Sequence, residues 1–380
     1  MQGRLRQSAA GGDETDSRIR PYDTPAFSPV PRGRSRNRCQ WLGAMAVGVG
    51  LSVLAPIPAL AHVGRAPTPD DLWSTWAIPP LPAIVLLITG WLYARGVATI
   101  WNHSAPERGI RRWQVASFAA GLLALALALL SPLDSLSNAL LSAHMTQHLL
   151  LIVIAPPLLV AGAPLPPILL GLPRAWRISV VGRWHRTGIV RRAWRFFEQP
   201  LVAWLIAAIV LWGWHVPVLY EAALRHSLLH ELEHVMFLGS SLLLWWALIA
   251  PLGRGDTRAY GIAMIAVFTT ALQGAAFGVL MTFAKAPWYP VYGDGAVAWH
   301  MTALEDQQFA GTIMWVPAGF AYLAAILCLM LAWLREAERT AQRDEGMVQV
   351  LDEGGQTPAR ISPPSAVSAG GHQEGVGQWA

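Results

Sequence analysis

Seven apolar runs, each long enough to cross a lipid bilayer, constrain the fold of this chain more than any other feature. A transmembrane helix needs about 20 mostly apolar residues. A composition of 54% hydrophobic and 13% charged residues supplies these runs and excludes an ordinary soluble domain. Backbone groups in lipid must form their hydrogen bonds within the protein, so the runs are expected to be helices. The sequence predicts an all-α, polytopic membrane bundle with seven transmembrane helices at 77–97, 113–133, 141–163, 200–217, 231–250, 260–283 and 308–334.

The segment before the first span is typical of a secretory signal. Alternate arginines between residues 32 and 38 precede the apolar stretch 41–61, which ends in Ala-Leu-Ala, a small-x-small cleavage pattern. Cleavage there would make His62 the first residue, and its amine and imidazole could chelate a cupric ion. The other end of the chain is polar and rich in Gly, Pro, Ser and Gln, which predicts a disordered cytoplasmic tail. The chain is therefore expected to have three parts: a disordered basic N-terminus with a signal peptide or signal anchor (1–61), a seven-span membrane domain (62–335) and the disordered tail (336–380).

Arginines between the predicted spans indicate the orientation. They concentrate in the connections at 95–112, 172–197 and 254–258, whereas the alternate connections carry few. Short positively charged loops stay in the cytoplasm. The pattern predicts that the N-terminus of the membrane domain lies outside and the C-terminus lies in the cytoplasm. No nucleic-acid-binding motif accompanies these arginines.

Histidines gather at the predicted outer ends of the spans. The segment HSLLHELEH places three of them one helical turn apart, so their imidazoles would form one stripe, and SAHMTQHLL repeats the spacing. Ionisable residues in transmembrane segments usually face the bundle interior and mark function. Imidazoles suit copper, zinc and iron. Six histidines are the candidate metal ligands: His144, His148, His215, His226, His230 and His234.

Thioethers and carboxylates accompany these histidines. Together with imidazole, thioethers favour copper, particularly in the cuprous state. The possible auxiliary ligands are His62, His300, Met145 and Met301. Carboxylates and amides could orient the ring nitrogens by hydrogen bonding. The candidates for this supporting role are Asp134, Glu231, Glu233, Asp306 and Gln307.

Two other chemistries stay open on the residues alone. His230, Glu231 and His234 match H-E-x-x-H, the pattern of zinc metallopeptidases, in which the glutamate is the general base. The same segment also matches the reversed H-x-x-E-H, so the pattern is permissive. Histidines on facing helices could also hold haem, although the chain has no C-x-x-C-H attachment motif. The cysteines Cys39 and Cys328 do not form the paired motif of thiolate copper carriers.

Three ordered blocks of this sequence resemble the CtaG family of bacterial cytochrome c oxidase assembly factors. They are HMTQHLLLIVIAPPLLVAGAP, then WGWHVPVLYEAAL with HSLLHELEHVMFLGSSLLLWW, and then LEDQQFAGTIMWVPAG. The resemblance extends from about Asp71 to about Trp333. The family blocks include the six candidate histidines together with Asp306 and Gln307.

The resemblance implies a multi-spanning protein of the bacterial inner membrane that acts with cytochrome c oxidase subunits during their assembly. Combined with the histidines, it predicts a non-enzymatic factor that binds copper at the outer face of the lipid bilayer for oxidase maturation. The alternative is a copper or haem transporter, which would need ligands through the depth of the membrane.

Overall fold

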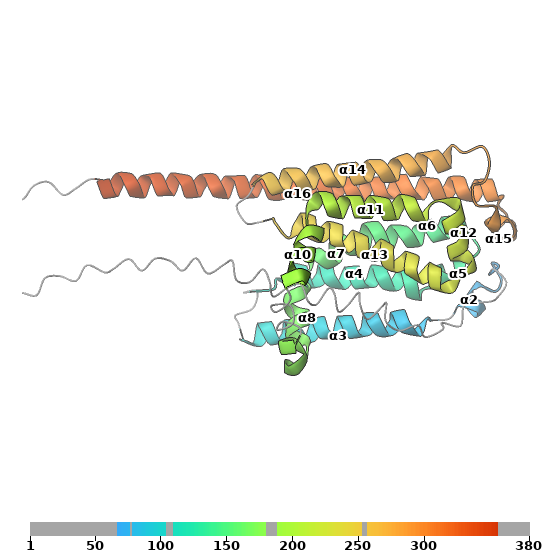
Figure 1. Ribbon diagram of the computed structural model, residues 1–380, viewed down its shortest axis with the longest axis horizontal. Helices are drawn as coiled ribbons and strands as arrows, with labels where there is room; N and C mark the ends of the chain where they lie inside the picture. Colours follow the sequence, from blue (N-terminus) through green and yellow to red (C-terminus); the bar gives the residue numbers. More distant parts are fainter. Residues whose placement is uncertain (1–66, 77, 104–108, 180–187, 253–256, 356–380) are drawn as a thin grey trace, which may run out of the picture. The chain divides into compact units, whose positions relative to one another are not determined.

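The computed structural model describes residues 67–76, 78–103, 109–179, 188–252 and 257–355. Over these ranges the regular elements are all helical, which confirms the predicted all-α class. The predicted signal segment and His62 lie outside the described residues. Figure 1 shows the long helices running side by side as a bundle.

Six helices are long and apolar enough to cross a membrane, and a bent pair brings the total to as many as seven. The protein is therefore a polytopic helical membrane protein, as predicted. The six are α3 (Pro80–His103), α4 (Arg112–Leu130), the segment Leu141–Ala161, α13 (Ser227–Ile249), α14 (Thr257–Thr282) and α16 (Ala303–Gly355).

The remaining span is broken. Helix α11 (Pro200–Trp214) has 15 residues, about 22 Å of helix, which is shorter than the bilayer core of about 30 Å. It forms a pair with α10 (Gly188–Phe197), bent by 73°. Proline at the first position of α11 disfavours helical geometry in the residue before it, and this explains the break.

The third span lies at the centre of the bundle. In its most apolar stretch of 18 residues 61% are buried, against 17% to 44% in the corresponding stretches of the other five candidate spans. It consists of α6 (Leu141–Leu149), a π-helical turn (Leu150–Ile154) and α7 (Ala155–Ala161). Pro156 and Pro157 lack the N–H groups that would continue the α-helical ladder, which accounts for the irregular turn before them. Such π turns are frequent at functional sites.

Helices α14 and α16 cross at two glycines. A Cβ atom on Gly278 would lie 2.8 Å from the carbonyl oxygen of Gly311, and one on Gly311 would lie 2.6 Å from that of Gly278. Small residues of this kind allow close packing of transmembrane helices. The crossing brings the start of α16 beside the end of α14.

The last helix is longer than predicted. α16 continues to Gly355, so residues 336–355 are helical where the sequence predicted a disordered tail. The stretch contains good helix formers, and an ion pair of 3.8 Å joins Glu336 to Arg339 one turn later. The Pro and Ser residues on which the prediction of disorder was based all lie beyond Gly355, so they do not interrupt this helix. The rest of the predicted tail lies outside the described residues.

Short helices cover one end of the bundle: α2 (Leu72–Thr75), α5 (Pro132–Leu136), α12 (Pro217–Arg225), the 3₁₀ turn Pro290–Tyr292 and α15 (Gly293–Ala298). This is the end that the arginine pattern predicts to be outside. A further short helix, α8 (Leu165–Gly171), packs against α3.

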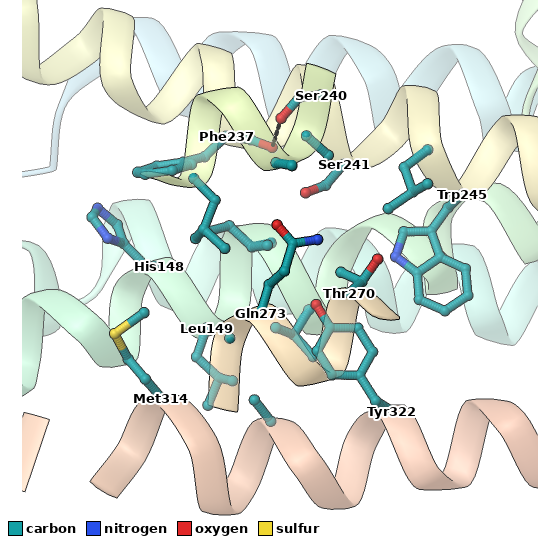
Figure 2. A pocket seen from close by; sticks show the side chains of 18 of the residues that line it. His148, Leu149, Phe237, Ser240, Ser241, Trp245, Thr270, Gln273, Met314 and Tyr322 are labelled. Carbon is teal, nitrogen blue, oxygen red and sulfur yellow. Dashed lines mark hydrogen bonds between the residues drawn. The ribbon is translucent and has the colours of Figure 1, made fainter. Parts of the chain in front are cut away.

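A cavity of about 50 Å³ lies inside the bundle, between the third span and helices α11, α13, α14 and α16. Figure 2 shows His148 and Met314 at one end of it and Trp245 and Tyr322 at the other. A single water needs about 10–15 Å³ of such space, so the cavity can hold an ion or a few waters.

Candidate metal centre

Five of the six candidate histidines come together at one end of the bundle. His144 and His148 project from α6, His230 and His234 from α13, and His215 follows the last residue of α11. The centroids of neighbouring rings are 4.3 to 6.2 Å apart. His144, His148 and His215 are buried. Tertiary packing therefore joins two i, i+4 pairs with a histidine from a third helix.

Asp306 positions the helix that carries the first pair. Its carboxylate is fully buried and accepts hydrogen bonds from the backbone N–H groups of Leu141, at 2.6 Å, and Ser142, at 3.1 Å. These N–H groups have no acceptor within the helix, because they lie at the N-terminus of α6. The helix dipole also favours a negative charge there. Asp306, from α16, thus anchors the start of α6 one turn before His144.

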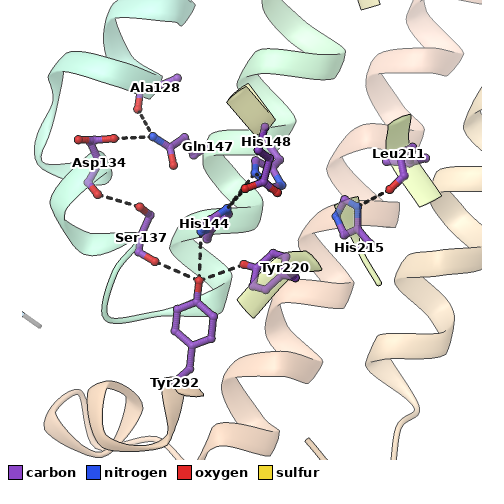
Figure 3. Close-up of polar contacts among 11 residues, drawn as sticks. Ala128, Asp134, Ser137, His144, Gln147, His148, Leu211, His215, Tyr220 and Tyr292 are labelled. Carbon is purple, nitrogen blue, oxygen red and sulfur yellow. Dashed lines mark hydrogen bonds and ion pairs between the residues drawn. The ribbon is translucent and has the colours of Figure 1, made fainter. Parts of the chain in front are cut away.

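The hydrogen bonds of Tyr292 assign the tautomer of His144. The Tyr292 hydroxyl lies 3.2 Å from the carbonyl oxygen of Ser137, which can only accept, so Tyr292 donates there. Its oxygen then accepts from the Tyr220 hydroxyl at 3.0 Å and from Nδ1–H of His144 at 3.1 Å (Figure 3). With the proton on Nδ1, Nε2 of His144 carries a free lone pair.

His215 is held in the same way. Its Nδ1 lies 2.7 Å from the carbonyl oxygen of Leu211, so Nδ1 carries the proton. The hydroxyl of Tyr289 donates to the carbonyl oxygen of His215 at 2.7 Å, which fixes the backbone there. Hydrogen bonding of one ring nitrogen to a carbonyl is the usual way in which proteins orient an imidazole that binds metal through the other nitrogen.

The Nε2 atoms of His144 and His148 lie beside Glu233. Nε2 of His144 is 2.9 Å from Nε2 of His148. The Glu233 oxygens are 4.0 Å from the former and 3.7 Å from the latter. Since His144 has its proton on Nδ1, His148 must donate in this pair. The side chain of Glu233 is fully buried.

The donor atoms form two overlapping sets, in each of which the ligand atoms lie within 4.8 Å of one another. One contains His144, His148 and His234, and the other contains His144, His230 and Glu233. Two ligands about 2.1 Å from a tetrahedral metal ion are about 3.4 Å apart. The residues therefore fit a single ion with little movement.

The site also contains buried polar atoms that have no hydrogen-bond partner in the protein. Nδ1 of His148, Nε2 of His215, His230 and His234, and both carboxylate oxygens of Glu233 are buried without a hydrogen-bond partner. A buried carboxylate needs a proton or a cation to offset its loss of hydration. The chemistry of these donors fits a metal ion.

The structure places several of the other sequence-predicted residues away from this cluster. His226 and His300 are exposed, and Glu231 is partly exposed. Met145 is fully buried in the wall of the neighbouring cavity, whereas Met301 packs in a different hydrophobic cluster.

The remaining polar residues of the prediction support loops and helix ends. Asp134 accepts a hydrogen bond from Gln147 at 2.8 Å. The Gln307 side chain accepts from the N–H of Trp288 at 2.5 Å and donates to the carbonyl of Ala286 at 3.4 Å. Gln307 thus holds the loop between α14 and α16 rather than a histidine ring.

Sequence reasoning missed the tyrosines. Tyr220, Tyr289 and Tyr292 are buried beside the histidines, and burial raises the pKa of Tyr292 well above its ordinary value, so its hydroxyl keeps its proton. Tyr220 lies within the WGWHVPVLYEAAL block, which was a usable signal. The other two lie in a loop whose spacing carries no motif.

The family of cytochrome c oxidase caa3 assembly factors (Caa3_CtaG) matches residues 91–336. Uncharacterized proteins of Mycobacterium bovis and Mycobacterium tuberculosis are each 25% identical over 320 residues, covering 80% of this chain and 48% of theirs. One from Mycobacterium leprae is 24% identical over 291 residues, covering 72% of this chain and 44% of its own. The chain thus spans about half the length of the curated relatives it matches. No solved structure matches.

Proposed function

The chain belongs to the cytochrome c oxidase caa3 assembly factor family, and from this premise we propose that it binds a copper ion between α6 and α13 for oxidase maturation. The observation that carries the proposal is the convergence of imidazole nitrogens on Glu233, which is fully buried and has no hydrogen-bond partner. An apolar core tolerates this arrangement when a cation is bound, because the ion replaces the missing partners.

Either His144, His148 and His234, or His144, His230 and Glu233, would hold the ion. His215 is near enough to exchange with one of them. Copper suits the family's process, and imidazole is one of its common ligands. When bound, the ion is cargo for the oxidase rather than a catalyst. The protein residues bind it, keep His144 in one tautomer and exclude water. We therefore propose a non-enzymatic role.

We propose that this site lies at the outer face of the bacterial inner membrane, with the C-terminus in the cytoplasm, and the arginine pattern supports this orientation. Cytochrome c oxidase subunits that receive copper would dock over the short helices at this end. This orientation and these partners are part of the proposal.

The structure supports a zinc peptidase less well than the sequence motif did. The H-E-x-x-H reading requires Glu231 as the general base, but Glu231 is partly exposed and Glu233 is the carboxylate beside the histidines. Haem is also less well supported, because the rings pack directly against one another and do not oppose each other across a porphyrin-sized slot.

The cavity beside His148 supports one alternative, a copper transporter, because it leads from the cluster into the bundle. Proteoliposomes distinguish the two roles. A carrier binds copper without moving it into the lumen, whereas a transporter accumulates it there.

The main experiment measures copper bound to the purified protein in detergent by mass spectrometry. The His144→Ala and His234→Ala variants should lose the copper. His226→Ala is the matched control, because it removes an exposed histidine next to the same helix, and it should bind copper like the wild type. Oxidase activity in cells should fall in the His144→Ala and His234→Ala variants and stay normal in the His226→Ala variant. The proposal is wrong if folded H144A and H234A proteins retain full copper content and support normal oxidase assembly.

A further inference from the structure

We propose that Met145 and Met314, together with His148, form a second position for copper, selective for the cuprous ion, at the end of the cavity next to the histidine cluster. This inference rests on the proposed function, because the second position would receive its ion from the histidines.

The three side chains come from two helices and share one cavity. Met145 and His148 lie on α6 and Met314 lies on α16, and all three line the cavity. Figure 2 shows His148 and Met314 at the same end. Met314 is far from the other two along the sequence. The packing of α6 against α16 brings it to them.

Both methionines are withdrawn from lipid. Met145 is fully buried and Met314 is 9% exposed, and they pack in one cluster with the site tyrosines Tyr220, Tyr289 and Tyr292. His148 is 1% exposed, and its Nδ1 has no hydrogen-bond partner. A buried, unpartnered imidazole nitrogen thus belongs to a side chain that lines the same space as two thioethers.

Several oxygen groups around the cavity are already engaged. The hydroxyl of Ser240 donates to the carbonyl of Phe237 at 3.2 Å, and that of Thr270 donates to the carbonyl of Ala266 at 2.7 Å. The carbonyl oxygen of the Gln273 side chain accepts from the Trp212 indole at 3.2 Å. The thioethers form no such bonds, so they are the soft ligands available to an ion.

The chemical softness of the ligands distinguishes the histidine cluster from the second position. Imidazoles and the Glu233 carboxylate accept cuprous, cupric or zinc ions, whereas thioethers select the cuprous ion. His148 belongs to both the cluster and the cavity wall, so it can stay bound while the other ligands exchange. The second position would filter the ion by identity and oxidation state without a redox step.

The test uses a Met145→Leu, Met314→Leu double variant, since Met and Leu have similar volumes and exchange at small cost. Met281→Leu is the matched control, because Met281 is fully buried in the same cluster but does not line the cavity. The reduced wild type and M281L, loaded with cuprous ion, should show sulfur in the copper coordination shell by X-ray absorption. The double variant should lose this signal.

Affinities give the second measurement. In competition with a chelator, the double variant should bind the cuprous ion at least about tenfold more weakly, because it lacks both thioether ligands, while its zinc affinity stays unchanged. A wild-type shell of nitrogen and oxygen alone, with equal cuprous affinities in all three proteins, overturns this inference and leaves the proposed function standing. A wild type that binds no copper overturns both.

Discussion

The hydroxyl oxygen of Tyr292 lies 3.1 Å from Nδ1 of His144 and thereby directs the Nε2 lone pair of that histidine toward His148 and Glu233. Tyr292 belongs to the loop between α14 and α16, and His144 belongs to the central span. A residue outside both sets of candidate ligands therefore sets which nitrogen of His144 is available.

Tyr292→Phe should weaken metal binding without unfolding the protein. The variant frees His144 to place its proton on Nε2, and the loss of such an orienting partner typically costs 10- to 100-fold in metal affinity. Tyr93→Phe is the control, since the buried Tyr93 hydroxyl donates to the carbonyl of Gly162 at 2.8 Å in another part of the bundle. Each variant should lose about 1 kcal/mol of stability. Equal metal affinities in the two would contradict the orienting role.

Glu233→Gln should make the metal-free protein more stable and the metal-loaded protein less so. Replacing a buried carboxylate that has no hydrogen-bond partner removes its desolvation penalty, which we expect to add about 1 kcal/mol or more to the metal-free stability. The neutral amide binds a cation poorly, so added copper should no longer raise the unfolding temperature. Glu231→Gln, on the same helix but partly exposed, should leave both measurements unchanged.

Asp306→Ala should destabilise the protein through α6. Removal of the carboxylate leaves the N–H groups of Leu141 and Ser142 buried without acceptors, at a cost of about 1–2 kcal/mol. Thermal unfolding in detergent measures the loss. Copper affinity should fall as well, because α6 carries His144 and His148. An unchanged melting temperature would show that Asp306 does not anchor the helix.

Gly278→Ala should separate α14 from α16. The added Cβ would lie 2.8 Å from the carbonyl oxygen of Gly311, and overpacking of this kind costs about 1–3 kcal/mol. Gly274→Ala is the control on the same helix, because a Cβ there meets nothing within 4 Å. In unfolding experiments the stability of G274A should equal or exceed that of the wild type, and the stability of G278A should be lower.

The segment HSLLHELEH illustrates the limit of spacing arguments. The predicted stripe assumed that the helix includes His226, but α13 begins at Ser227, and His226 is its N-cap with extended backbone angles of φ −129° and ψ 110°. The stripe therefore starts one turn later, at His230. Where a helix begins depends on the turn that joins it to α12, which the pattern of histidines does not encode.

Local periodicity and hydrophobicity were enough to determine the helical class, the approximate spans and the two i, i+4 histidine pairs, because these depend on residues within a few turns of each other. The tertiary structure decided which carboxylate faces the pairs. Glu231 and Glu233 are both next to a histidine along α13, and only the tertiary packing buries the second, beside His148. It likewise brought Tyr292 and Met314 to the site from more than a hundred residues away along the chain, since such contacts arise from helix packing and leave no periodic trace in the sequence.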